Sequence, residues 1–325
     1  MYAIQVAKHG GPEVLDYTEV PSPTPSEEQV LVDVITAGVN YIDTYYREGI
    51  YNAQTPFTIG LEGVGRVVSD PKGEIAQGTM VAWNNAFGSY AEQVCVDRNR
   101  MVAVPDDIDT NVAGTMLLQG MTAHALVTDC YRVQEGTVAL VHAAAGGVGQ
   151  LLTQMITARG GLVIATAGSP DKLEIARSRG ATELIDYSAT DDLAGEIATA
   201  AERIGAPRGV DVAYDGVGKA TFDASLASLR TRGTLVLFGG ASGQVPPFDL
   251  QRLNAGGSLF VTRPSLAHFI EETEELQLRG REVFADVSAG RLDIAVGGRY
   301  SFADAAEAYR ALEGRATTGK LILVP

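Results

Sequence analysis

The chain has 325 residues, enough for two domains of ordinary size, and 46% of them are hydrophobic, as in globular proteins with a full core. Its formal net charge of −15 argues against nucleic acid as a partner, because an acidic surface repels phosphate backbones. No apolar run reaches the ~18 residues that span a membrane, no signal peptide is evident, and two cysteines cannot build a disulfide framework. We therefore expect a cytoplasmic protein with no membrane partner.

Residues 1–118 have the pattern of an irregular β domain. Short apolar or alternating runs, such as 29–35 and 65–69, are separated by glycines and prolines. Between two of these strands, the segment 38–51 is expected to be a loop, and it holds four tyrosines. Any one of these tyrosines can simply cover the core, but together they predict the wall of a pocket for a flat, partly polar ligand.

The pattern changes in the second third of the chain. Residues 113–127 are apolar at helical spacing and should lead into a second domain, with His124 as a packed helix residue rather than a catalyst. From residue 138 strands and helices alternate, which indicates a parallel sheet with helices on both faces. The expected strands are 138–142, 161–166, 183–187, 210–214, 233–239 and 257–262, and the expected helices are 149–159, 170–179, 190–204 and 219–230. The tail should contain helices near 265–279 and 303–313 and a strand at 320–324, and should fold back onto the first domain.

A glycine turn follows the strand at 138–142. Gly146 and Gly149 match the last two glycines of the dinucleotide-binding fingerprint, whereas Ala144 replaces the first. In that fingerprint one glycine lets the backbone approach a pyrophosphate and the other lets the next helix pack closely, so that the helix amides face the phosphate charge. A tight connection without a ligand is the alternative. The strand–helix units that follow favour a dinucleotide domain.

The tip of the next strand predicts which dinucleotide binds. An acidic residue there would bond the ribose hydroxyls and repel a 2′-phosphate, but this strand ends in small neutral residues at 167–169. Ser169, Lys172 and Tyr187 are nearby donors suited to a phosphate dianion. Asp171 counts against this interpretation unless it faces solvent, and Lys172 can also be a plain surface charge. We predict NADPH as the cofactor.

These motifs resemble the medium-chain dehydrogenase/reductase superfamily, and within it the zinc-free NADPH:quinone oxidoreductase (zeta-crystallin-like) branch. The most specific pieces are His142-Ala-Ala-Ala-Gly-Gly-Val-Gly149 and Val261-Thr-Arg-Pro-Ser-Leu266, and the likeness covers essentially the whole chain. It implies an α/β protein in which a GroES-like β-rich catalytic domain, residues 1–118 and 264–325, holds an inserted Rossmann NADPH-binding domain, residues 119–263. It also implies homodimers that join through the strand at 257–262.

The zinc-dependent relatives in this superfamily have a cysteine where this chain has Asn40 and a histidine where it has Leu61, beside Glu62. With two cysteines in all, neither the catalytic nor the structural zinc site can be assembled at the expected spacings, so we expect no metal. Without a Lewis acid, oxidation of an alcohol is difficult, whereas reduction of an electrophilic acceptor is easier.

We therefore expect hydride transfer from NADPH to a quinone. In such chemistry the protein positions the reactants, excludes water and offers donors to the developing oxyanion. The candidate catalytic residues are Tyr45 and Tyr51 as donors and Asn40 as a support for the cofactor ribose or the acceptor. The resemblance implies cofactor contacts at Tyr41, Ile42, Asp43, Thr44, Tyr45, Thr122, Gly146, Gly147, Val148, Gly168, Ser169, Lys172, Tyr187, Val217, Phe238, Gly239, Gly240, Ala241, Ser242, Pro264, Ser265, Leu266 and Arg315.

Two alternative functions stay open. An NADPH-dependent alkenal, enone or enoyl-thioester double-bond reductase would use the same cofactor machinery and differ only in its acceptor pocket. A thioester carrier would favour basic residues at the entrance, and no such cluster is evident. Outside the enzymes, the alternative is an NADPH-binding sensor or an RNA-binding protein. The −15 charge argues against RNA, and the tyrosine-rich segment argues against an inactive enzyme.

Overall fold

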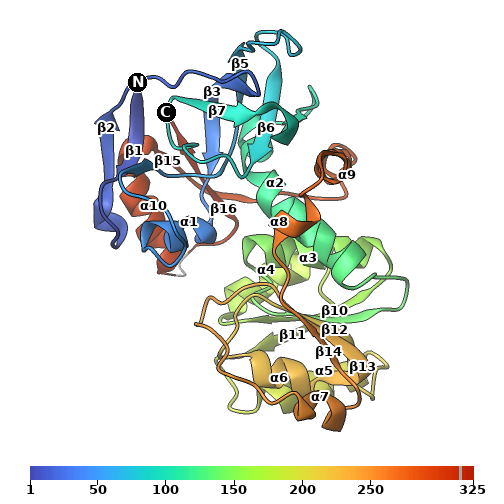
Figure 1. The fold of residues 1–325 in the computed structure, drawn as a ribbon. Coiled ribbons are helices and arrows are strands. Elements are labelled where there is room, and N and C mark those ends of the chain that lie inside the picture. Colours follow the sequence, from blue (N-terminus) through green and yellow to red (C-terminus); the bar gives the residue numbers. More distant parts are fainter. Residues whose placement is uncertain (315–316) are drawn as a thin grey trace. The chain divides into compact units, whose positions relative to one another are not determined.

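The computed structural model describes residues 1–314 and 317–325 and divides the chain into two compact units (Figure 1). Unit 1 comprises Met1–Met121 and Ile270–Pro325, and unit 2 comprises Thr122–Phe269. The first boundary falls within helix α2 (Thr110–Ala125), and the second follows helix α8 (Leu266–Phe269). Within the described ranges, every helix is too short or too polar to cross a membrane.

Unit 1 is built mainly from β-strands. Its larger sheet has the strand order β15-β16-β3-β5-β6-β8, with β7 also paired to β3, and its smaller sheet has the order β2-β1-β4. The strands are β1 (Tyr2–Val6), β2 (Leu15–Glu19), β3 (Gln29–Gly38), β4 (Phe57–Thr58), β5 (Glu62–Ser69), β6 (Met80–Asn84), β7 (Gln93–Asp97), β8 (Met101–Ala103), β15 (Val296–Ser301) and β16 (Lys320–Val324), and the helices besides α2 are α1 (Tyr41–Arg47), α9 (Thr273–Ser288) and α10 (Ala305–Glu313).

The alternating pattern of the strands fixes the core of unit 1. In β3 every second residue from Val30 to Val34 is buried, and it packs with Trp83 and Tyr90 in one hydrophobic cluster. The C-terminal strand β16 pairs antiparallel with β3, with Ile322 opposite Gly38. This pairing brings the last residues of the chain beside the start of α1, which follows β3 directly.

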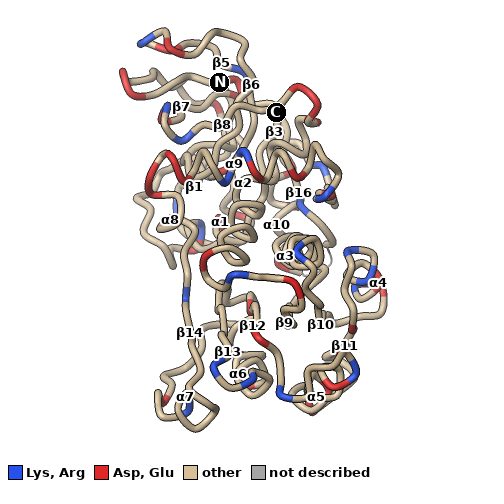
Figure 2. The backbone as a smooth tube through the Cα atoms, turned by 90° about the vertical axis from the view of Figure 1, so that its right-hand side faces the viewer, with Lys and Arg blue, Asp and Glu red and all other residues tan. Residues whose placement is uncertain are grey.

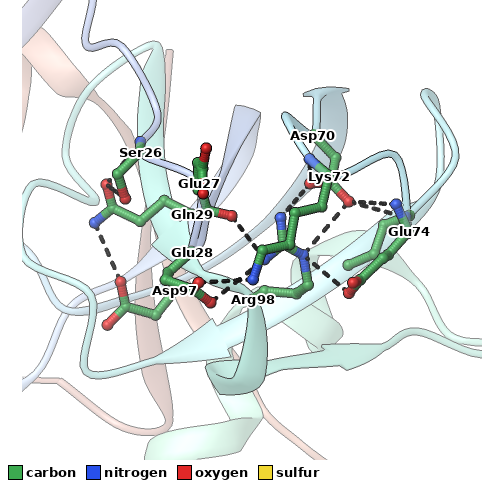
Figure 3. A network of polar contacts seen from close by, with 10 residues as sticks. Ser26, Glu27, Glu28, Gln29, Asp70, Lys72, Glu74, Asp97 and Arg98 are labelled. Carbon is green, nitrogen blue, oxygen red and sulfur yellow. Dashed lines mark hydrogen bonds and ion pairs between the residues drawn. The ribbon is translucent and has the colours of Figure 1, made fainter.

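An ion-pair network fixes the loop after β5 (Figure 3). The Asp70 carboxylate accepts hydrogen bonds from three backbone amides of the 72–75 turn, over 2.9 to 3.0 Å. It also pairs with Arg98, which donates to the carbonyl of Glu27 over 2.9 Å. The network therefore ties the 72–75 turn to the segment that follows β7.

Unit 2 is a parallel sheet with the strand order β11-β10-β9-β12-β13-β14. Numbered from its first strand this is 3-2-1-4-5-6, the doubly wound order of dinucleotide-binding domains. Figure 1 shows α3 and α4 on one face of the sheet and α5 and α6 on the other. The predicted α/β class, with a Rossmann sheet, is confirmed. The strands are β9 (Val138–Val141), β10 (Leu162–Ala167), β11 (Glu183–Asp186), β12 (Val210–Asp215), β13 (Leu229–Leu237) and β14 (Phe260–Thr262), and the helices are α3 (Gly147–Ala158), α4 (Pro170–Ser178), α5 (Leu193–Arg203), α6 (Phe222–Ala227), α7 (Gln251–Ala255) and α8.

Four predicted elements were wrong in type or extent. The segment 38–51, expected to be a loop, contains helix α1, because the Asp43 carboxylate reaches back to the backbone amide of Asn40 and caps the first turn. The helix expected at 219–230 ends at Ala227, since β13 already begins at Leu229. The helix expected near 265–279 is interrupted, because the extended backbone of Glu272 separates α8 from α9.

The strand expected at 257–262 is shorter than predicted, because Gly257 and Ser258 have left-handed φ angles of +105° and +57° that no strand adopts. Acidic and basic residues are spread through both units, and the excess of acid does not come from one segment (Figure 2).

Candidate cofactor and acceptor sites

The glycine turn of unit 2 lies at the carboxyl end of β9, where the strand order reverses between β9 and β12. Ala143 has a left-handed φ of +51°, and Gly146 precedes the first turn of α3. A Cβ atom on Gly149 would lie 2.4 Å from the carbonyl oxygen of Ala143, so only glycine lets α3 pack this closely on the turn. Gly146 is exposed, and Gly147 and Val148 are half-buried, so the helix amides can be reached by a phosphate.

The tip of β10 gathers the residues predicted for the 2′-phosphate. Ser169 accepts a weak hydrogen bond from the Lys172 amide over 3.5 Å at the start of α4. A Cβ atom on Gly168 would lie 2.7 Å from the Tyr187 hydroxyl, so the Tyr187 side chain lies directly against this glycine. Asp171 is exposed and so faces solvent, which is the condition under which its charge does not count against a phosphate at this site. Tyr187 and the start of α4 thus lie at the tip of β10, and the strand itself ends without an acid.

The loops after β12 and β13 lie against each other. The carbonyl of Val217 accepts hydrogen bonds from both the amide and the hydroxyl of Ser242, each over 2.8 Å. A Cβ atom on Gly239 would lie 2.3 Å from the carbonyl oxygen of Gly216, so the two loops meet through glycines with no room for a side chain. The structure thus brings together two groups of predicted cofactor residues, Val217 and the segment 238–242.

In unit 1, α1 and the residues after it form a cluster of aromatic rings. Tyr45 lies edge-on to both Tyr41 and Tyr51, with ring centroids 5.7 and 5.3 Å apart, and Tyr46 contacts Tyr51 and Phe87 in the same way. Tyr51 is 40% exposed and Tyr41 is 38% exposed. The two tyrosines predicted as acceptor-side donors are therefore in contact, and one of them is open to solvent.

The side chains of Asn40 and Asp43 are turned into the interior of unit 1. The Asn40 amide donates to Glu62 over 2.9 Å and accepts from Lys320, whose ammonium also donates to Glu62 over 2.8 Å. Asp43 accepts from the Tyr90 hydroxyl over 2.8 Å, and its burial raises its pKa to about 6. These groups are 3% exposed or less. Their side chains support the start of α1, and contact with cofactor or acceptor stays a prediction for them.

Sequence reasoning missed the partners that hold this helix. Lys320 begins an apolar strand and Glu62 begins another largely buried one, and a lysine and an acid in such places are the signal of a buried ion pair. Tyr309 on α10 also donates to Asp43, over 3.0 Å, and nothing in the local sequence marks it.

The other predicted cofactor residues are spread over several elements. Thr44 is buried in α1, where its hydroxyl donates to the carbonyl of Tyr41 over 2.6 Å, and Ile42 is half-buried. In unit 2, Thr122 is half-buried on α2, Pro264 and the exposed Ser265 lie between β14 and α8, and Leu266 begins α8. Arg315 lies outside the described residues. Among the described side chains, no group of three or more His, Cys, Asp and Glu residues could hold a metal ion.

Two family models match the chain. Residues 26–106 match the alcohol dehydrogenase GroES-like domain, and residues 147–276 match the zinc-binding dehydrogenase model. The second matched range contains no cysteine.

Relatives match the full length of the chain. The quinone oxidoreductase of Pseudomonas aeruginosa is 38% identical over 99% of both chains. A mycobacterial protein solved in complex with NADPH is 44% identical, with a TM-score of 0.95 over 100% of both chains. The quinone oxidoreductase of Escherichia coli, also complexed with NADPH, is 34% identical, with a TM-score of 0.96 over 100% of both chains. The chain therefore belongs to the quinone oxidoreductase branch of the medium-chain dehydrogenase/reductase superfamily.

Proposed function

We propose that this protein is a zinc-independent quinone oxidoreductase that uses NADPH. The observation that carries the proposal is the tip of β10, where Tyr187 lies against Gly168, Ser169 caps α4 with Lys172 in its first turn, and no acidic residue stands at the strand end. This group stands beside the glycine turn of a doubly wound sheet, at the edge where such sheets bind dinucleotides. The full-length likeness to quinone oxidoreductases supports the same assignment.

The residues present fit this cofactor. The amides at the start of α3 would hold the pyrophosphate, Ser169, Lys172 and Tyr187 the 2′-phosphate, and the loops at 216–218 and 238–242 the nicotinamide half. When bound, NADPH supplies the hydride. The loops that meet at Gly216 and Gly239 leave no room for side chains between them, so they present backbone groups in one fixed arrangement.

Tyr45 and Tyr51 are proposed to bind the acceptor. Their rings contact each other in an aromatic cluster in which Tyr51 is exposed and Tyr45 is half-buried, which suits a flat quinone, and their hydroxyls can donate to the oxygen on which negative charge develops. For Asn40 we propose a supporting role, because its amide is already bonded to Glu62 and Lys320. Asn40 is the N-cap of α1, and its orientation thereby helps to set the direction of Tyr45 on this helix.

We further propose the domain arrangement and the partners that the sequence predicts. Residues 1–118 and 264–325 would form the catalytic domain and residues 119–263 the cofactor domain, in a cytoplasmic protein with no nucleic-acid or membrane partner. The strand β14 at the edge of the unit 2 sheet exposes Phe260 by 60% and Val261 by 36%. An open edge with apolar side chains is suited to pairing with a second copy, which supports a homodimer.

The test is turnover with two acceptor classes. The loss of NADPH absorbance is followed with benzoquinone or phenanthrenequinone, beside hexenal as a conjugated alkenal, and with NADH as the alternative donor. Turnover of the quinones with NADPH alone is the expected result. Turnover of the alkenal alone would make the protein a double-bond reductase with the same cofactor site. Equal rates with NADH would refute the assignment of the β10 tip, and NADPH binding without turnover would favour the sensor.

A further inference from the structure

A chain of hydrogen bonds runs through the interior of unit 2 along the carboxyl ends of its central strands. His142, which follows β9, is 1% exposed. Its Nδ1 lies 2.8 Å from the Thr166 hydroxyl on β10, and its Nε2 lies 2.9 Å from the Ser225 hydroxyl on α6. Ser225 in turn donates to the carboxylate of Asp215 over 2.8 Å, at the end of β12. The four side chains connect three strands and one helix.

Each hydrogen bond between these four side chains can have only one donor. Oδ1 of Asp215 accepts the amides of Val217 and Gly218 over 2.8 and 2.9 Å, and the Thr221 hydroxyl lies 2.7 to 2.8 Å from both carboxylate oxygens. An ionised carboxylate with these donors around it can only accept, also at Oδ2, where Ser225 bonds. The Ser225 proton is therefore directed at Asp215, and the Ser225 oxygen must accept from His142. It follows that Nε2 of His142 carries the proton and that Nδ1 accepts from Thr166. Burial lowers the pKa of His142, in agreement with a neutral ring.

The two ends of this hydrogen-bond chain lie next to the two halves of the candidate cofactor site. His142 is followed by Ala143, whose left-handed φ of +51° opens the glycine turn. At the other end, Asp215 holds the amides of the 216–218 loop, and this loop is bonded to the 238–242 loop through Ser242. The hydrogen-bond chain thus sets the position of both loops relative to the glycine turn.

We propose that His142 is a positioning residue, which as the neutral Nε2–H tautomer holds the loops for the nicotinamide half of NADPH in register with the turn for its pyrophosphate. The identity of the ligand rests on the proposed function, whereas the direction of the hydrogen bonds does not. Loss of one member of the chain should therefore weaken the contacts of the nicotinamide half and leave those of the adenosine half unchanged.

The first experiment compares two ligands on three proteins by titration calorimetry. Ser225→Ala removes the hydroxyl between His142 and Asp215, and we expect the Kd for NADPH to rise by about tenfold. The Kd of Ser225→Ala for 2′,5′-ADP should stay within about twofold of that of the unmodified protein, because this ligand carries only the adenosine half and does not reach the loops. Ser228→Ala is the matched control. Ser228 is also buried at the end of this helix segment, but its hydroxyl donates only to the carbonyl of Ala224.

Equal weakening of both ligands by Ser225→Ala, or no weakening of either, would overturn the proposal. If the unmodified protein fails to bind NADPH, the proposed function fails instead, and a second measurement still tests the chain. Nitrogen NMR of the imidazoles in the free protein should show Nε2 of His142 protonated and Nδ1 unprotonated. The signals that disappear in His142→Gln are those of His142, one of four histidines. Thr166→Val, which removes the donor to Nδ1, should shift the same signals and so offers a second way to assign them. A protonated Nδ1 would refute the assigned direction.

Discussion

Replacing Asp43 with asparagine will change how the stability of unit 1 depends on pH. One oxygen of the Asp43 carboxylate accepts hydrogen bonds from the backbone amide of Asn40 and from the hydroxyls of Tyr90 and Tyr309, over 2.8 to 3.0 Å. The other oxygen is buried and has no partner among the described residues. Asparagine can keep the three bonds with its own oxygen and place its amide where the protonated carboxyl carries its hydrogen.

The magnitude follows from the pKa of this carboxyl, which burial raises from 3.8 to about 6. Between these values the folded protein holds a proton that the unfolded chain has lost, so the free energy of unfolding falls as the pH rises through this window. The whole effect is about 3 kcal/mol, at about 1.4 kcal/mol for each pH unit. The asparagine variant does not titrate, so its stability relative to the parent should rise by that amount from about pH 4 to about pH 7.

Urea unfolding at a series of pH values measures this difference. The two units can unfold separately, so the signal must come from unit 1 alone. Trp83, the only tryptophan of the chain, is fully buried in the core of unit 1, and its fluorescence reports that unit. A difference between variant and parent that stays constant across the window, or that falls, would refute the reasoning that burial dominates at Asp43.

Four other substitutions have defined outcomes. For Asp70→Asn we expect the stability difference between variant and parent to depend on pH with the opposite sign. The Arg98 guanidinium holds the pKa of Asp70 well below its usual range (Figure 3). The stability that Asp70 contributes is therefore present near neutral pH and is lost as the pH falls through the acid range. Urea unfolding should show the parent's advantage shrinking towards acid pH. For Lys172→Ala, initial rates should show a KM for NADPH about tenfold higher and an unchanged KM for NADH, because a charge-assisted bond to the 2′-phosphate is lost. Gly149→Ala places a methyl group 2.4 Å from the carbonyl oxygen of Ala143, and the forced shift of the turn, at about 1–3 kcal/mol, should weaken NADPH binding by about tenfold or more in calorimetry. Phe260→Lys puts a charge on the open edge of β14, and sedimentation should show a monomer where the parent is a dimer.

Specific results would contradict the last three of these predictions. Arg177→Ala, at an exposed position of the same helix as Lys172, is the control that should change neither KM, and an equal effect of both variants would contradict a specific phosphate contact. Unchanged NADPH affinity in Gly149→Ala would mean that the turn does not contact the cofactor. If sedimentation shows that the parent of Phe260→Lys is already a monomer, the proposed homodimer is wrong.

The sequence alone determined those features that depend on neighbours along the chain. A short apolar run, a glycine turn and a helix at 138–158 predicted the first strand–helix unit, because the periods of strands and helices and the steric limits on non-glycine residues are local properties. The absence of an acid at the tip of β10 could likewise be read directly, since a strand tip and the helix start beyond it are adjacent in sequence. For the same reason the alternation of strands and helices predicted the sheet of unit 2.

Only the tertiary structure decided which distant side chains meet. Lys320 and Asn40 stand 280 positions apart and bond because β16 pairs with β3, and that register follows from packing of the whole sheet. The contact between His142 and Ser225 depends in the same way on where α6 lies against the sheet. Local pattern shows that a polar residue is buried, but its partner is set by the arrangement of elements, because a hydrogen bond requires two groups within about 3 Å and sequence spacing does not carry that distance.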